Sequence, residues 1–212
     1  MIITTILLMS LSELSSQINF EFKFGYSPAS NPKTAYVLIN RENPFQEFKF
    51  NMVHTKTQFF GGIGLNVRLK SPFFIEGGLM YTKKTSEFMM DYVLTRESEP
   101  DVQYMNESEH ILMLPVNVGF SVGKFDLTSG FSAKTTISRS TELSHIDGFS
   151  SDGNKLKMGW QMGARYAIKR AFIGAEYQGS FNRVCEGEYV NNHSLAVMNI
   201  PGQWVFSVQY RL

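Results

Sequence analysis

The sequence predicts an all-β fold: an eight-stranded antiparallel up-and-down transmembrane β-barrel with four long extracellular loops and three short periplasmic turns. Three observations lead to this fold class. Apolar residues occupy every second position in eight segments, which is the pattern of a β-strand. Tight turns alternate with long connections between these segments. The polar side of the alternation is rich in glycine and in isolated charges, which suits a narrow barrel interior.

The composition removes several other classes of protein. The chain has 212 residues, with 20 Lys and Arg against 19 Asp and Glu, so it lacks the basic excess of a nucleic-acid-binding protein. A single cysteine, Cys185, excludes an internal disulfide. The four histidines show no spacing typical of metal ligands, and we expect neither a metal nor a cofactor. No run of apolar residues is long enough for a transmembrane helix.

The first segment, residues 1–16, is predicted to be a signal peptide, and residues 17–212 the barrel. An apolar stretch over Ile2–Leu11 has the length of a signal-peptide core, and small polar residues follow it. Cleavage after Ser16 would leave Gln17 first. A basic residue near the start is missing, and a short buried strand or helix is the alternative. A signal peptide implies export, so the chain is expected outside the cytoplasm.

The first predicted strand, Ile18–Tyr26, shows the alternation most clearly. Four aromatic residues and one isoleucine share one face, while Asn19, Glu21, Lys23 and Gly25 share the other. Seven further segments repeat the pattern. In chain order they are Phe59–Leu69, Phe73–Thr82, His110–Val122, Phe125–Ser138, Leu156–Ile168, Ala171–Asn182 and Gln203–Leu212.

The connections between the predicted strands alternate in length. Tight turns are expected around Lys70–Pro72, Gly123–Lys124 and Lys169–Arg170, and long loops join the remaining neighbours. Short turns at one end and long loops at the other are typical of outer-membrane barrels. Pro115 lies inside the fourth strand, where proline cannot donate a ladder hydrogen bond, so we expect a β-bulge there.

The polar face is predicted to line the barrel interior and the apolar face to contact lipid. A soluble barrel or sandwich would reverse this arrangement, but small residues interleaved with charges of both signs suit a crowded interior better than a water-exposed surface. Buried charges require partners, so a lumenal ion-pair network is expected. Its predicted members are Glu21, Lys23, Arg68, Glu76, Asp126, Lys134, Lys157, Arg165, Glu176 and Arg211.

Aromatic residues on the apolar face lie near both ends of the strands, as in the two interface girdles of membrane barrels. The girdle near the loop end is predicted to contain Tyr26, Phe59, Tyr81, Phe181 and Trp204. The girdle near the turn end is predicted to contain Phe73, Phe125, Tyr166 and Tyr210.

Two segments resemble a known family. Ile111–Lys134 resembles the central hairpin of the small outer-membrane β-barrel proteins of Bacteroidetes, often labelled porin family or PorT-like, in which Pro115 and Gly130 occupy matching places. Trp204–Leu212 resembles the barrel-insertion signal, although its last residue is leucine rather than the commoner phenylalanine. The residues of this signal are Trp204, Phe206, Val208, Tyr210 and Leu212. The resemblance implies the bacterial outer membrane as location and, for some members, a role in type IX secretion.

We expect a non-enzymatic barrel with a charge-plugged lumen that acts as a scaffold or accessory subunit of a secretion or assembly complex. Its expected partners are outer-membrane lipid and a protein in the outer membrane or at the cell surface, with no nucleic acid. One alternative is a narrow channel for small solutes or ions. A lipid-modifying enzyme is the other, with His193 beside Ser194 or His110 near Ser108 as candidate groups, which we interpret as solvated loop residues.

Three loop features complete the expectations. The connection between the third and fourth strands is interpreted as a solvated acidic loop without a calcium-binding pattern. Over residues 87–109 its charged residues are Glu87, Asp91, Arg96, Glu97, Glu99, Asp101, Glu107 and Glu109. The loop over residues 27–58 contains three prolines and is expected to be mobile or ordered by a partner. Cys185 is an unpaired thiol in the last loop.

Overall fold

The computed structural model describes most of the chain. The described residues are 18–31, 34–39, 47–69, 71–93, 101–145, 149–151, 156–181, 188–190, 193–194 and 202–212. The expected signal peptide lies outside them, as do Cys185, Lys70 and the side chains of His193 and Ser194. Within the described part of the chain, no helix is long and apolar enough to cross a membrane.

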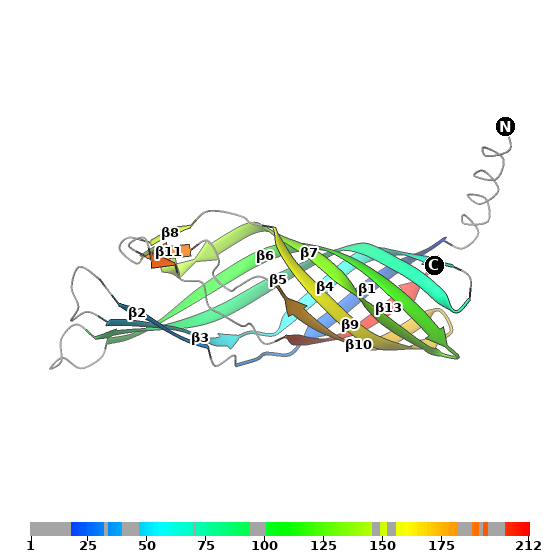
Figure 1. The fold of residues 1–212 in the computed structure, drawn as a ribbon, viewed down its shortest axis with the longest axis horizontal. Coiled ribbons are helices and arrows are strands. Elements are labelled where there is room, and N and C mark those ends of the chain that lie inside the picture. Colours follow the sequence, from blue (N-terminus) through cyan, green and yellow to red (C-terminus); the bar gives the residue numbers. More distant parts are fainter. Residues whose placement is uncertain are drawn as a thin grey trace, which may run out of the picture.

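Eight of the strands among the described residues form a closed antiparallel ring (Figure 1). Neighbouring strands pair in the order β1–β4–β5–β6–β7–β9–β10–β13, and β13 returns to β1. The ring strands are β1 (Ile18–Ser27), β4 (Gln58–Arg68), β5 (Phe73–Val93), β6 (Asp101–Val122), β7 (Phe125–Thr141), β9 (Lys157–Ile168), β10 (Ala171–Ser180) and β13 (Gln203–Arg211). The predicted eight-stranded antiparallel barrel is therefore confirmed.

The remaining elements lie beyond the ring at its loop end. They are β2 (Thr34–Ile39), β3 (Glu47–Thr55), the 3₁₀ helix η1 (Glu142–His145), β8 (Phe149–Ser151), β11 (Glu188–Val190) and β12 (His193–Ser194). β2 pairs with β3, and β3 pairs with the outer half of β5. β8, β11 and β12 form a separate three-stranded sheet. We call this assembly, together with the outer parts of β5, β6 and β7, the head.

The outer parts of β5 and β6 correct two sequence predictions. The third and fourth strands were expected to stop at Thr82 and to begin at His110, with an acidic loop between them, whereas β5 continues to Val93 and β6 begins at Asp101. The register runs without a shift from the barrel into the head. Most of the expected acidic loop is therefore a paired hairpin. β2 and β3 likewise place strands in the segment 27–58.

The expected bulge at Pro115 is wrong. Pro115 pairs in register with Ser132 of β7, and the irregularity between β6 and β7 lies five residues away, between His110 and Ile111. On the other side of Pro115, the pairing with β5 is interrupted between Gly77 and Met80 but resumes in the same register. The barrel therefore accommodates a residue without an N–H by omitting ladder contacts, without inserting a residue at that point.

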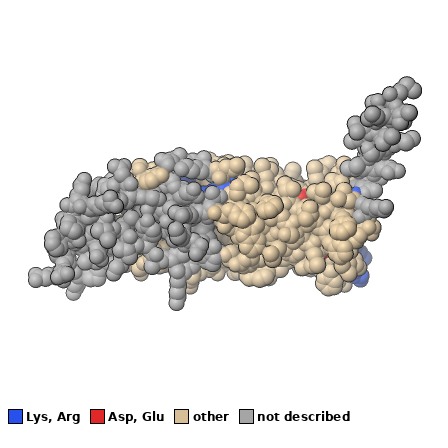
Figure 2. Space-filling model, viewed as in Figure 1, with Lys and Arg blue, Asp and Glu red and all other residues tan. Residues whose placement is uncertain are grey.

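The two faces of the ring differ in chemistry as the alternation predicts. Large apolar side chains on the outer face are exposed, for example Phe24 at 64%, Phe59 at 71% and Val118 at 63%. On the face of the barrel that Figure 2 shows, charged residues are sparse over a broad band. Exposed apolar surface on this scale is costly in water and favourable in hydrocarbon, so the band is the lipid-contacting surface.

Candidate functional site: a filled lumen

Arg165 on β9 is the centre of an ion-pair cluster inside the barrel, near the turn end. Its guanidinium Nη1 lies 2.6 Å from Glu76 Oε2 and 3.8 Å from Glu21 Oε2, and its Nε lies 3.1 Å from Asp126 Oδ2. Gln209 Oε1 accepts a further hydrogen bond from Nη1 at 2.5 Å. These partners lie on β5, β1, β7 and β13, so a single guanidinium links four other strands of the ring.

Two further ion pairs extend the cluster along the lumen. Arg211 donates from Nε and Nη2 to Glu21 Oε1, at 2.9 and 2.6 Å. Lys23 pairs with Glu176. The carboxylates of Glu21 and Glu176 are buried, at 6% exposure each, so their charges are balanced within the protein instead of by water.

Two aromatic rings in the lumen lie close to the central guanidinium. The Arg165 Cζ lies 5.1 Å from the ring centre of Phe74 and 5.0 Å from that of Phe172, and the Arg211 Cζ lies 4.4 Å from the same Phe172 ring. Both rings are buried, with exposures of 2% and 3%. Cation–π contact in a site without bulk water adds to the fixation of the guanidinium.

Glycines opposite the large lumenal side chains provide the space that these side chains occupy. Gly174 pairs in register with Arg165, and Gly163 pairs with Glu176. A Cβ on Gly130 would lie 2.1 Å from the Val116 carbonyl oxygen and 2.6 Å from the Asn117 Cα, which are backbone atoms that cannot move aside. Gly130, Gly163 and Gly174 are therefore the small halves of small–large pairs across the strands.

An amide layer and then an apolar layer lie above the ion pairs. Asn117 Nδ2 donates to Glu76 Oε1 at 2.9 Å, and Gln161 Nε2 donates to Asn117 Oδ1 at 2.8 Å. The apolar layer is a buried cluster of four inward-facing side chains, which are Phe60, Met80, Met113 and Val205. Charged, amide and apolar layers together leave little free space along the axis.

Three small cavities lie between described residues of the lumen. One cavity of about 30 Å³ lies between Glu21, Lys23, Glu76 and Asn117. Two others, of about 10 Å³ each, lie near the apolar layer and beside Arg165. A cavity of 10–15 Å³ holds about one water molecule. Each of these three cavities therefore has room for isolated waters only.

A second charged cluster lies at the mouth of the lumen, beyond the aromatic residues of the loop end. Lys157 Nζ lies 3.6 Å from Glu109 Oε1, and Thr136 Oγ1 donates to the same oxygen at 3.1 Å. Glu107 pairs with Arg139. Burial alone would raise the pKa of the Glu109 carboxyl, but the Lys84, Lys157 and Arg139 cations outweigh it and hold that pKa below its ordinary value of 4.5.

The structure separates the predicted network residues into three groups. Seven of the ten belong to the cluster around Arg165 near the turn end. Lys134 and Lys157 belong instead to the mouth, where Lys134 Nζ donates to Gln178 Oε1 at 3.5 Å. Arg68 is exposed at the turn end and lies outside both clusters, which corrects its expected place in the network. Its inward parity is right, but it is the last residue of β4, where the lumen opens to solvent.

The predicted network left out the neutral and aromatic members of the lumen, although Asn117, Gln161 and Gln209 lie on the polar face that the alternation assigns to the interior. Phe74, Phe172, Asn117, Gln161 and Gln209 have the same strand parity as the predicted charges, so the alternation contained the signal. Phe74 and Phe172 were overlooked because each follows or precedes another apolar residue, which hides the inward position. Glu107, Glu109 and Arg139 were missed because that segment was expected to be a loop.

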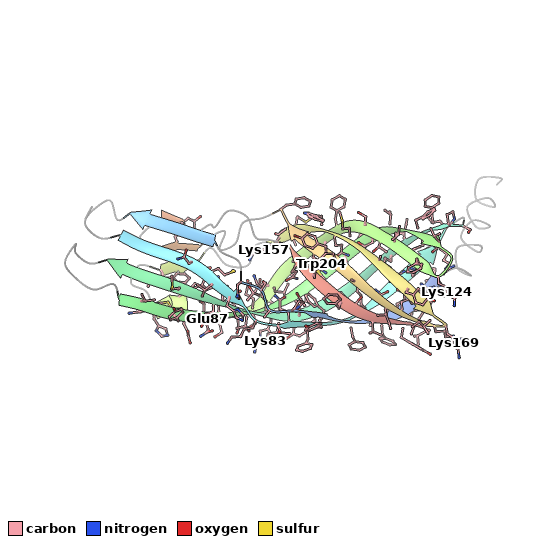
Figure 3. The ribbon with its side chains drawn as sticks, turned by 90° about the horizontal axis from the view of Figure 1, so that it is seen from below. Lys83, Glu87, Lys124, Lys157, Lys169 and Trp204 are labelled. Carbon is pink, nitrogen blue, oxygen red and sulfur yellow. The ribbon has the colours of Figure 1, made fainter. Side chains whose placement is uncertain are left out.

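The predicted girdle residues lie on the outer face, where several contact one another. Near the loop end, Tyr26 lies 6.2 Å from Phe59 and from Phe206, measured between ring centres. Near the turn end, Phe125 lies 5.0 Å from Tyr166. Figure 3 places Trp204 on the barrel wall toward the loop end. Further aromatic residues extend these groups, among them Trp160, Tyr177, Phe120 and Phe131.

The hydrogen-bond partner of His110, the candidate catalytic histidine, is a tyrosine. His110 Nδ1 and the Tyr81 hydroxyl lie 2.5 Å apart on the outer face, and their rings lie 6.0 Å apart. Ser108 Oγ instead lies 3.2 Å from Thr85 Oγ1. Among the described residues, no group of three or more His, Cys, Asp or Glu side chains could hold a metal ion.

A closed ring with an apolar outer face, two aromatic girdles and an ion-paired interior defines a transmembrane β-barrel of the outer-membrane type. The comparison with known protein families agrees. The family described as outer membrane protein beta-barrel domain matches residues 9–210, so the chain belongs to this family and is located in the bacterial outer membrane. No curated protein matches the chain. The short turns therefore face the periplasm, and the head faces the cell exterior.

Proposed function

We propose that the protein is a non-enzymatic, closed barrel that presents its head to a protein partner, as a scaffold or accessory subunit of an outer-membrane complex. The filled lumen is the observation that carries this proposal. Arg165 and Glu76 lie on β9 and β5, which are not neighbours in the ring, so their ion pair crosses the interior instead of following its wall. A transport path would require these contacts to open.

The construction of the head supports a docking role. The hairpin of β5 and β6 continues well beyond the barrel, and β3 and β2 widen it into a sheet. Buried apolar side chains give this part of the head a packed core of its own. They are Met52, Phe88, Met90, Met105 and Leu143. A head with its own core offers a partner a surface that is already ordered, which lowers the entropic cost of binding.

The edge of the head sheet suggests how a partner could bind. β2 stands at the end of the strand order and, among the described residues, pairs only with β3. An exposed edge strand can accept a strand from another protein through main-chain hydrogen bonds. We therefore propose β2 as the docking edge.

The finer family assignment is part of this proposal. The resemblance of Ile111–Lys134 to PorT-like barrels of Bacteroidetes supports a place in the secretion or assembly machinery of that group, and export by the signal peptide over residues 1–16 is consistent with it. A narrow channel is the second candidate, because the lumenal wall is polar. The cavities of about 30 Å³ or less favour the closed barrel.

A co-purification experiment tests the scaffold. The tagged barrel is isolated from native membranes beside a variant in which residues 31–55 are replaced by a short Gly-Ser linker. We expect a stoichiometric partner with the natural chain and its loss from the variant, while heat-modifiable migration in gels shows that both barrels are folded. Equal recovery of the same partner by both proteins would move the docking surface away from β2 and β3. Recovery of the natural chain alone, without any stoichiometric partner, would contradict the scaffold.

A further inference from the structure

We infer that the periplasmic rim of the barrel is a binding site for the phosphate headgroups of anionic phospholipids in the inner leaflet of the outer membrane. Exposed cations gather at this rim. They are Arg68 at the end of β4, Lys124 between β6 and β7, and Lys169 and Arg170 between β9 and β10. Each short connection thus has at least one exposed cation in it or directly beside it. Figure 3 shows Lys124 and Lys169 at this end of the barrel, and Figure 2 shows blue surface there.

The rim has no exposed carboxylate side chain to neutralise these cations, as far as the structure describes it. The acidic residues nearest this end are Glu21, Glu76 and Asp126, which are buried at 6%, 8% and 4% exposure. All three are engaged in the lumen by Arg165 or Arg211. The side-chain carboxylates nearest the rim are thus held inside the barrel by other cations. Among the described residues, no side-chain carboxylate balances the exposed cations of the rim, which leaves them available to an external anion.

The height of the cations relative to the membrane identifies the kind of anion. The turn-end girdle marks the boundary of the hydrocarbon region, since aromatic side chains of membrane proteins gather at the headgroup level. Lys124 Nζ lies 5.9 Å from the ring centre of Tyr166, a girdle residue. Lys124 is therefore at headgroup height, and Lys169 and Arg170 follow β9 directly beyond Tyr166 and Ile168. A phosphodiester beside the barrel wall lies within reach of this rim, and its acyl chains would contact the exposed apolar band.

Native mass spectrometry of the detergent-solubilised barrel tests this site. The barrel is incubated with phosphatidylglycerol and phosphatidylcholine of identical acyl chains, and the ratio of the two bound lipids is measured. A cation near a membrane surface contributes about fivefold to anionic-lipid binding. We expect an excess of phosphatidylglycerol on the natural chain and a loss of about tenfold or more in that excess for the Lys124→Gln, Arg170→Gln double variant.

Two control variants test whether the loss of lipid preference is specific to the rim. Lys56→Gln with Lys83→Gln removes the same charge from exposed positions at the loop end and should leave the lipid ratio unchanged. Lys124→Arg with Arg170→Lys retains the charge and should retain the excess. The inference is wrong if the natural chain binds both lipids equally, or if the rim and loop-end variants lose the excess equally. Because partner binding at the head is measured separately, failure here leaves the proposed scaffold function intact.

Discussion

Arg165 is the residue on which the lumen depends most. Its guanidinium contacts carboxylates from β5 and β7, lies close to a third from β1, and makes cation–π contacts with two phenylalanine rings. Removal of one partner from a buried ion pair leaves an uncompensated buried charge, which costs more than the pair contributes. Arg68, which shares its charge and parity but not its burial, is the natural comparison.

The Arg165→Ala variant should lower the free energy of unfolding by about 3–5 kcal/mol, because Glu76 and Asp126 remain buried without their cation. Denaturant titration in detergent micelles, followed by tryptophan fluorescence, measures this loss. Arg68→Ala should stay within about 0.5 kcal/mol of the natural chain, as exposed substitutions usually do. Addition of Glu76→Gln and Asp126→Asn to Arg165→Ala should recover part of the loss. Equal stability of the Arg165 and Arg68 variants would show that the lumenal cluster does not hold the barrel together.

At the scale of elements, the ring strands could be predicted from sequence and the head could not. Inside the membrane the two faces of a strand meet lipid and a polar lumen, so the alternation is strong, as in Ile18–Ser27. Beyond Thr82 the strands leave the membrane, and the contrast between a lipid-facing and a lumenal face disappears. There one face of the sheet includes the buried Phe88 and Met90, and the other face meets water. In the sequence, charged residues such as Glu107 and Glu109 then look like those of a solvated loop, although they continue the inward-facing positions of the strand.

The lumenal site could be predicted in part for the same reason. Charges at inward positions predicted the ion pairs of Glu21, Glu76 and Asp126, because a buried charge needs a partner. Which partner each charge meets depends on strand tilt and on the register around the whole ring. The sequence of a single strand carries no information on either. Arg165 therefore engages a carboxylate on β5, a strand that is not its neighbour, and this contact could not be inferred from parity.

The charged cluster at the mouth of the lumen should stabilise the folded protein less at low pH. The pKa of Glu109 is held below 4.5 in the folded protein by Lys84, Lys157 and Arg139, despite its burial. A depressed folded-state pKa gives a stability contribution that is present above the unfolded-state pKa, and it is lost as the pH falls through the folded-state value. We expect the contribution to be complete at neutral pH and to decline below about pH 4.5.

Amide hydrogen exchange of the outer halves of β5 and β6, corrected for the intrinsic pH dependence of exchange, measures this decline. Protection should fall in the natural chain on acidification, and Glu109→Gln should show low protection at neutral pH with little further change. An equal acid response in both proteins would assign the effect to other carboxylates.

At the scale of the whole molecule, the barrel separates two functions by position. The membrane-spanning ring has an apolar band outside and stacked charged, amide and apolar layers inside, and it holds the head at one end and the cationic rim at the other. An eight-stranded ring is just wide enough for side chains to fill its interior. The near-zero net charge of the chain thus includes opposite charges paired inside the barrel.

Single-channel conductance in a planar lipid bilayer tests the closed barrel most directly. Heat-modifiable migration of the same preparation verifies that the barrel is folded, so that an absence of conductance is not caused by unfolded protein. We expect no steady conductance from the natural chain, because the charged, amide and apolar layers from Arg165 to Met113 lie across the lumen. Stable, reproducible conductance steps from the folded natural chain would contradict the closed lumen and favour the channel.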